Sequence, residues 1–68
     1  MDTATKIRTA MDEAGISRVE LAAEMTRCGV PTSDAAVGAW LCGRNEPKTA
    51  AALAMARVLG TTVEEMFG

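Results

Sequence analysis

Apolar residues recur every three or four positions along most of the chain, which is the spacing of an amphipathic helix. In the first such segment Ala4, Ile7 and Met11 share one face, while the charged residues between them fall on the other. Glycine or proline interrupts the pattern at short intervals. The pattern predicts five helices, at residues 4–14 after a cap at Thr3, and at residues 18–28, 34–42, 49–59 and 63–67.

Residue types at the predicted helix ends agree with these boundaries. Ser17 followed by Glu20 forms a capping box, in which each side chain satisfies a free backbone N–H at the helix start. Thr62 and Glu65 repeat the pattern before the last helix, and Ser33 is a suitable N-cap for the third. Glycine, which commonly ends helices, follows four of the segments, at Gly15, Gly29, Gly43 and Gly60.

The chain has 68 residues, of which 49% are hydrophobic, so it suffices for one small domain near the lower size at which a single core sustains a fold. No alternating run typical of a strand occurs, and the expected fold class is all-α. Much of the hydrophobic fraction is alanine, so the larger side chains are expected to fill the core. These are Ile7, Met11, Ile16, Leu21, Met25, Val37, Trp40, Leu41, Leu53, Leu59 and Met66.

The stretch from Ser17 to Gly43 is expected to contain two short helices joined by a connection that includes Gly29 and Pro31. Two helices linked in this way are typical of a helix-turn-helix, whose second helix enters the major groove of DNA. The other predicted helices are expected to support this pair.

The order and spacing of these features resemble the lambda repressor-like (Cro/XRE-type) helix-turn-helix family over nearly the whole chain. The matching segments are residues 7–25 (IRTAMDEAGISRVELAAEM), residues 37–43 (VGAWLCG), a loop that closes on Pro47, and residues 52–67 (ALAMARVLGTTVEEMF). The resemblance implies a compact five-helix DNA-binding domain. The interval from Leu21 to Ser33 is longer than is usual in the family, so either the second helix is extended or the turn is expanded.

The resemblance also implies a DNA interface. The groove-facing side of the third helix would carry Ser33, Asp34, Ala35, Gly38 and Ala39. Arg18, together with Arg44, Asn45 and Lys48 in the loop after the third helix, would approach phosphates. Arg27 and Thr32, which flank the connection, are expected to join them because phosphate contacts supply register and much of the affinity.

Charge supports a DNA partner only weakly. Seven Lys and Arg against nine Asp and Glu give a net charge of −2, and the isoelectric point is near 4.9, whereas DNA-binding domains usually carry a basic footprint. Between Arg27 and Lys48 basic residues slightly outnumber acidic ones. The third helix lacks Arg, Lys, Asn and Gln, the residue types that most often pair with base edges. Gly38 would allow the third helix to approach DNA or a partner helix closely. Alternatively, the glycine is simply tolerated at this position.

Catalysis and metal binding are not expected. The chain has no histidine, no pairing of a nucleophile with a base and no phosphate-binding loop. Cys28 and Cys42 do not form a zinc-binding or disulfide pattern, so both are expected to be reduced thiols. No cofactor and no small-molecule ligand is expected. Because neither a signal peptide nor a long apolar span is visible, the expected location is the cytoplasm.

The favoured function is a sequence-specific DNA-binding regulator, a repressor of phage, mobile-element or bacterial origin. A domain of this size contacts few base pairs, so a homodimer on a two-fold symmetric operator is expected. Its dimer surface is expected at the last helix, through Val63, Met66 and Phe67.

A second interpretation remains open. A fold alone does not determine function. The small residues of the third helix would also allow a helix of a protein partner to pack against it. The arginine and lysine side chains named above would then be ordinary solvated charges.

Overall fold

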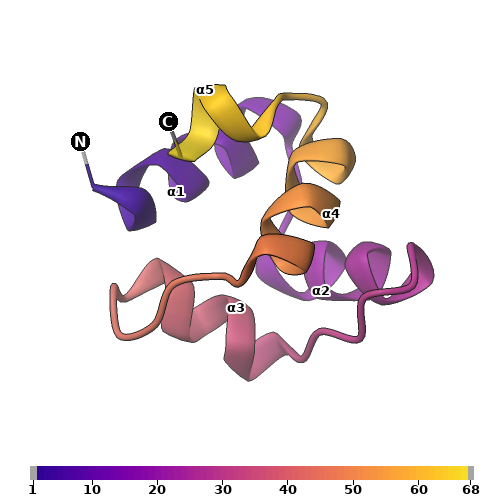
Figure 1. Cartoon of the computed structure of the whole chain (residues 1–68). Coiled ribbons are helices and arrows are strands. Elements are labelled where there is room, and N and C mark those ends of the chain that lie inside the picture. Colours follow the sequence, from indigo (N-terminus) through magenta and orange to yellow (C-terminus); the bar gives the residue numbers. More distant parts are fainter. Residues whose placement is uncertain (1, 68) are drawn as a thin grey trace.

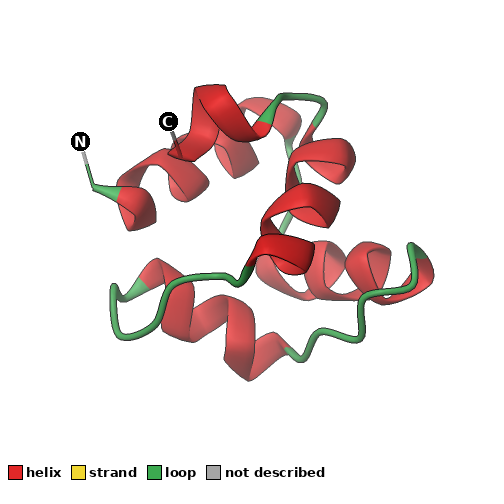
Figure 2. Ribbon diagram, viewed as in Figure 1, coloured by secondary structure: helices red, strands yellow, loops and turns green. Residues whose placement is uncertain are grey.

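The computed structural model describes residues 2–67, which form five helices and no strand (Figures 1 and 2). The helices are α1 (Thr3–Ala14), α2 (Arg18–Arg27), α3 (Asp34–Leu41), α4 (Thr49–Leu59) and α5 (Val63–Phe67). The predicted all-α class and the number and order of the helices are therefore confirmed.

The helices pack around one core. Helix α1 packs against α3, α4 and α5, whereas α2 packs against α3 and α4. In Figure 1, α4 lies between α5 above it and α2 below it. This arrangement leaves one side of α3 without a covering helix, since α3 contacts only α1 and α2 among the described elements.

Side-chain capping explains where α1, α2 and α3 begin, whereas α4 begins after Lys48 without a side-chain cap. The Ser17 hydroxyl accepts a hydrogen bond from the Glu20 backbone N–H at 3.2 Å, and the Glu20 carboxylate accepts one from the Ser17 N–H at 3.0 Å. The predicted capping box is therefore confirmed. The prediction of Thr3 as the first cap is wrong: the Asp2 carboxylate accepts from the Thr5 N–H at 2.8 Å. An aspartate one position earlier provides the acceptor, and Thr3 forms the first helical residue.

Helices α2 and α3 each end one residue earlier than predicted, at Arg27 and Leu41. Cys28 and Cys42 are the C-cap residues. Because α2 does not extend beyond Arg27, the long interval before α3 is an expanded turn and not a longer helix.

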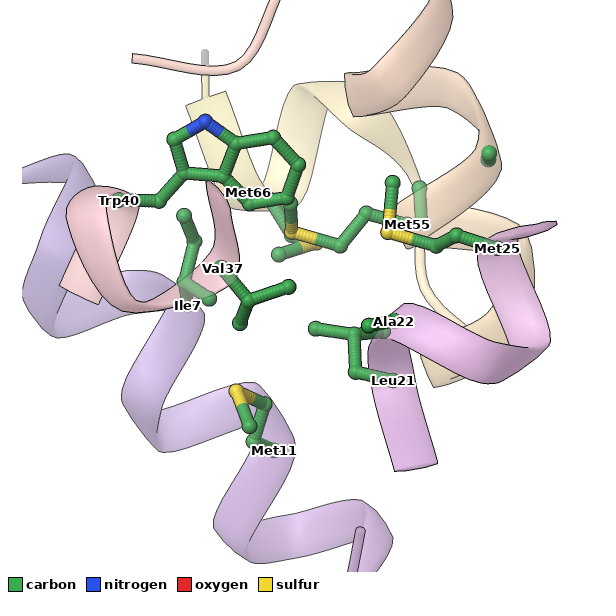
Figure 3. Packing of buried hydrophobic residues seen from close by; sticks show 11 residues of the cluster. Ile7, Met11, Leu21, Ala22, Met25, Val37, Trp40, Met55 and Met66 are labelled. Atoms are coloured by element: carbon green, nitrogen blue, oxygen red, sulfur yellow. The ribbon is translucent and has the colours of Figure 1, made fainter. Parts of the chain in front are cut away.

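Side chains from all five helices form the core, and those labelled in Figure 3 point toward one another. The most deeply buried of the large side chains are Ile7, Leu21, Met25, Val37 and Met55. Of the other residues predicted for the core, Met11, Trp40 and Met66 are buried, while Ile16, Leu41 and Leu59 are partly buried against the cluster.

Leu53 is the exception, because 53% of its surface is exposed. On α4 the buried residues are Ala52, Ala54, Met55 and Ala56. Leu53 is not among them, and the core position belongs to Met55. In an alanine-rich helix the positions of the large residues alone do not determine which face is buried.

Two hydrogen bonds connect α1 to the region around the end of α3. The Arg8 guanidinium donates to the Leu41 carbonyl at 3.1 Å, and the Thr3 hydroxyl donates to the Glu46 carboxylate at 2.9 Å. A carbonyl in the last turn of a helix has no partner within the helix. Arg8 therefore supplies a donor there and fixes the end of α3 against α1. Over the described part of the chain, no helix combines the length and apolar character that crossing a bilayer requires.

Candidate functional site

The uncovered side of α3 carries Asp34, Ala35, Gly38, Ala39 and Cys42, which we call the α3 outer stripe. Together with Arg18 and Arg44 these residues line one shallow surface hollow of about 400 Å³. Val37 and Trp40, on the other side of the helix, are buried. Four of the five predicted groove-facing residues are thus brought together with two of the predicted phosphate-facing residues.

Arg18, the first residue of α2, forms an ion pair with Asp34, the first residue of α3. The Arg18 Nε atom lies 2.7 Å from the Asp34 Oδ1 atom, and the two side chains are 52% and 48% exposed. An ion pair this open to water contributes at most about 1 kcal/mol to stability. Its main consequence is geometric, because it holds the Arg18 side chain across the start of α3.

Gly38 lies one helical turn after Asp34, and the Arg18 side chain passes directly over it. A Cβ atom placed on Gly38 would lie 3.2 Å from the Arg18 Nη1 atom and 3.7 Å from its Cδ atom. The close approach indicated by this glycine is therefore made by an arginine of the same chain. The sequence analysis did not predict this contact because it joins two helices. Its only signals in the sequence are an arginine at the start of one helix and an Asp-xxx-Gly spacing in the next.

Arg44 reaches the hollow because of the way α3 ends. Gly43 has a φ of 74°, in the left-handed region that glycine favours. The Gly43 N–H donates to the Trp40 carbonyl at 3.2 Å, and the Arg44 N–H donates to the Ala39 carbonyl at 3.0 Å. This pair of bonds is a Schellman motif. It turns the chain back on the helix and places Arg44 beside the far end of the α3 outer stripe.

Ser33 acts as the N-cap of α3. Its hydroxyl accepts a hydrogen bond from the Ala36 N–H at 3.0 Å, and the residue is exposed. The predicted cap is confirmed, and the side chain stands at the N-terminal end of the stripe.

The expanded turn between α2 and α3 is held by Thr26. Its hydroxyl oxygen lies 2.9 Å from the Ala22 carbonyl and 3.2 Å from the Thr32 carbonyl, and it accepts from the Thr32 N–H at 3.0 Å. Within the turn, the Thr32 hydroxyl donates to the Val30 carbonyl at 2.8 Å. One side chain of α2 therefore determines the path of the chain as it enters α3. The role of Thr26 was not predicted from the sequence.

Three predicted phosphate-facing residues gather in a different hollow. Thr32, Asn45 and Lys48 line it, between the α2–α3 turn and the loop that precedes α4. Its lining also includes the apolar residues Pro31 and Trp40 and the acidic residue Glu46. This second hollow flanks α3, so these residues lie beside the α3 outer stripe and not on it.

Arg27 is not brought together with the other predicted interface residues. Its guanidinium forms an ion pair with the Glu24 carboxylate at 2.7 Å. It lines a third hollow with Arg57, Ile16 and Cys28, between the end of α2 and the end of α4. The positively charged residues of the chain are therefore divided between separate surfaces.

The three residues predicted for the dimer surface do not lie on one surface. Val63 and Phe67 are partly buried and line a mainly apolar hollow with Leu53, Ala52 and Pro47. Thr3, Glu46 and Thr49 also line it. Met66, however, is only 3% exposed and belongs to the core. Its placement in a surface interface was wrong, because this side of α5 packs against α1 and α4.

Hydrogen bonding at two helix starts lowers the pKa of two carboxyl groups. The Thr5 side chain, followed by its backbone N–H, lowers the pKa of Asp2. The Ser17 backbone N–H, followed by its hydroxyl, lowers the pKa of Glu20. Both groups act in helix capping and neither lines the hollow beside α3.

Cys28 and Cys42 are both exposed free thiols. No group of three or more potential metal ligands occurs within residues 2–67. Comparison of the chain with known protein families, with curated proteins and with solved structures found no match.

Proposed function

We propose that this protein is a DNA-binding transcriptional regulator in which α2 and α3 act as a helix-turn-helix. The α3 outer stripe would lie in the major groove. The observation that carries the proposal is a solvent-facing helix side of small residues with an arginine at each end, Arg18 and Arg44. Small residues let a helix backbone approach base edges closely, while arginines supply contacts to phosphates and bases.

The distribution of charge supports this orientation more than the total charge does. In the first hollow Asp34 offsets Arg18, so Arg44 leaves a net positive charge. Within the described residues neither Arg44 nor Lys48 takes part in an ion pair. Both are therefore available to contact phosphate oxygens on either side of a groove occupied by α3.

We further propose a homodimer on a two-fold symmetric operator, acting as a repressor in the cytoplasm of a bacterial cell. The dimer surface would use Leu53, Val63 and Phe67, which border one apolar hollow. Leu53 is a large apolar side chain that protrudes into solvent beside it. Burying this surface between two copies would remove apolar area from water, and a dimer supplies the second α3 that a two-fold operator requires.

A binding measurement with charge-matched variants tests the proposal. The wild-type chain is titrated into fluorescent duplexes from the region upstream of its own gene, and anisotropy reports binding. Arg44→Ala should weaken binding at least about fivefold. Arg57→Ala removes the same charge from the separate hollow between α2 and α4, so it should leave the affinity nearly unchanged. Absence of binding, or equal losses for both variants, would contradict the proposal.

The second candidate is a protein-binding module on the same scaffold. Its supporting observation is the acidic net charge of −2 combined with the alanines and glycine in the middle of the α3 outer stripe, a surface that a partner helix can approach closely. In that case the chain should capture one protein stoichiometrically from its host. Gly38→Glu should abolish the capture, and no DNA fragment should bind.

A further inference from the structure

Within α3, Asp34 is the only side chain of the α3 outer stripe that can hydrogen-bond a base, and it is already paired with Arg18. The stripe residues within the helix are aspartate, alanine and glycine. Specific readout most often uses Arg or Lys on guanine, or Asn or Gln on adenine. A helix with this composition reads little by itself, so a side chain contributed by another element would have to supply the specificity.

We infer that Arg18, contributed by α2 and held across α3 by Asp34, is the residue that specifies guanine in the operator. The inference rests on the proposed function. It assigns Arg18 to a base edge, where the family resemblance implied a phosphate contact.

The hydrogen-bonding groups of Arg18 fit this role. Asp34 Oδ1 engages the Nε atom at 2.7 Å. The guanidinium carries five N–H donors in a planar fork, so the donors on its two terminal nitrogens remain for another acceptor pair. Guanine presents two adjacent acceptors, O6 and N7, in the major groove, and an arginine fork binds both.

Gly38 explains how an arginine from another helix reaches the groove-facing side. Because Gly38 has no side chain, the Arg18 Nη1 atom can approach the α3 backbone closely. A Cβ atom at position 38 would lie only 3.2 Å from it. The guanidinium therefore lies against α3 and lines the same hollow as Ala35 and Ala39. An arginine held in place by a carboxylate also loses less side-chain entropy on binding.

The Asp34 carboxylate further favours a base over a phosphate as the partner of Arg18. A phosphate beside the pair would meet the negative charge of Asp34 within a few ångströms, and like charges at that range repel. The bases of the major groove carry no formal charge. The major groove also presents the cytosine amino group, from which an aspartate oxygen can accept a hydrogen bond.

Selection of binding sites from a pool of random duplexes tests the inference. The wild-type chain should enrich sites with a guanine at one fixed position in each half-site. Arg18→Lys keeps the positive charge but loses the planar fork, so it should lower the preference for that guanine at least fivefold. Arg57→Lys makes the same change in the separate hollow between α2 and α4, so it should leave the preference intact.

Asp34→Asn and Glu24→Gln form a second matched pair. Each removes one negative charge from an ion pair at 2.7 Å, but only the first pair lies at the α3 outer stripe. Asp34→Asn should relax the guanine preference, whereas Glu24→Gln should not. Thermal melting of each variant confirms that it is folded.

The outcomes separate the two proposals. If the wild-type chain enriches a site and Arg18→Lys retains the same guanine preference, the inference about Arg18 is overturned while DNA binding stands. Enrichment of sites without a fixed guanine overturns it equally. If the wild-type chain binds no duplex at all, both the inference and the proposed function fail.

Discussion

Arg18 and Asp34, the first residues of α2 and α3, lie in contact, with 2.7 Å between Nε and Oδ1. The two residues are 16 positions apart in the sequence, and their pairing joins the starts of two helices. Because Gly38 leaves space beneath the guanidinium, the Arg18 side chain lies along α3, although both partners of the pair are about half exposed. Two arginines line the hollow beside the α3 outer stripe. Arg44 follows the end of α3, whereas Arg18 comes from α2.

The glycines at 38 and 43 should respond in opposite ways to alanine. Gly38→Ala should stabilise the fold by up to about 1 kcal/mol, because alanine is the better helix former and the nearest neighbour is the end of a half-exposed arginine that can shift. Gly43→Ala should destabilise the fold by about 1–2 kcal/mol, because its φ of 74° is costly for alanine. Urea denaturation measures both. A loss of stability in Gly38→Ala would show that Arg18 cannot move aside.

Thr26 should be necessary for the expanded turn. Thr26→Val preserves the shape of the side chain but removes the hydroxyl that engages Ala22 and Thr32, so it should destabilise the fold by about 1 kcal/mol. Thr26→Ser retains the hydroxyl and should lose less. Amide hydrogen exchange at Thr32 should accelerate in the valine variant alone. Equal exchange in all three proteins would mean that Thr26 does not hold the turn.

Acid should weaken the starts of α1 and α2. The pKa values of Asp2 and Glu20 are lowered in the folded chain, so their ionised forms stabilise the fold at neutral pH. That contribution should decline as the pH falls below about 4, the ordinary range of carboxyl groups, and should vanish below the folded pKa values. The double variant Asp2→Asn, Glu20→Gln should lose less stability than wild type between pH 5 and pH 3, as measured by urea midpoints. An unchanged pH dependence would contradict the assignment.

Leu53 should be important for self-association but not for folding. Leu53→Lys should leave the melting temperature nearly unchanged, since the side chain is 53% exposed, and should shift sedimentation equilibrium to the monomer. Val19→Lys is the matched control, because Val19 is 62% exposed but lies on α2, away from the apolar hollow. Met66→Ala should instead destabilise the monomer by about 2–5 kcal/mol, as expected for a buried side chain. A wild-type chain that is already monomeric at all concentrations would contradict this dimer surface.

The helix boundaries were predictable from the sequence because capping is local. Ser17, Glu20 and Ser33 satisfy backbone groups within three residues of themselves, and the left-handed glycines follow immediately after the helices. The sequence therefore contains both the donor and the acceptor of each cap within a short window. The errors are shifts of one residue: Asp2 and not Thr3 caps α1, and α2 and α3 end at Arg27 and Leu41.

The rotation of α4 and α5 and the contacts between helices were less predictable. Leu53 was wrongly placed in the core, and Met66, correctly placed there, was also wrongly placed in the dimer surface. Each helix offers apolar residues on more than one side. Packing of α4 against α1 and α2, and of α5 against α1 and α4, selects Met55 and Met66 for the core. The contact of Arg18 with Asp34 and Gly38 depends on how α2 crosses α3. The spacing of apolar residues along the sequence does not determine that crossing. The sequence therefore predicted both the α3 residues of the candidate site and Arg18 as a neighbour of them, but not the position of Arg18 across α3.

The salt dependence of DNA affinity tests the central claim most directly. If two protomers each place Arg44 and Lys48 on phosphates, four contacts predict that log K falls against log salt concentration with a slope of about −3 to −4. The double variant Arg44→Ala, Lys48→Ala should reduce that slope toward zero. Anisotropy titrations from 50 to 300 mM salt, with the site selected by the wild-type chain, give both values. A slope near zero for the wild type, or no binding to any duplex, would contradict the proposal that α3 lies in a DNA groove.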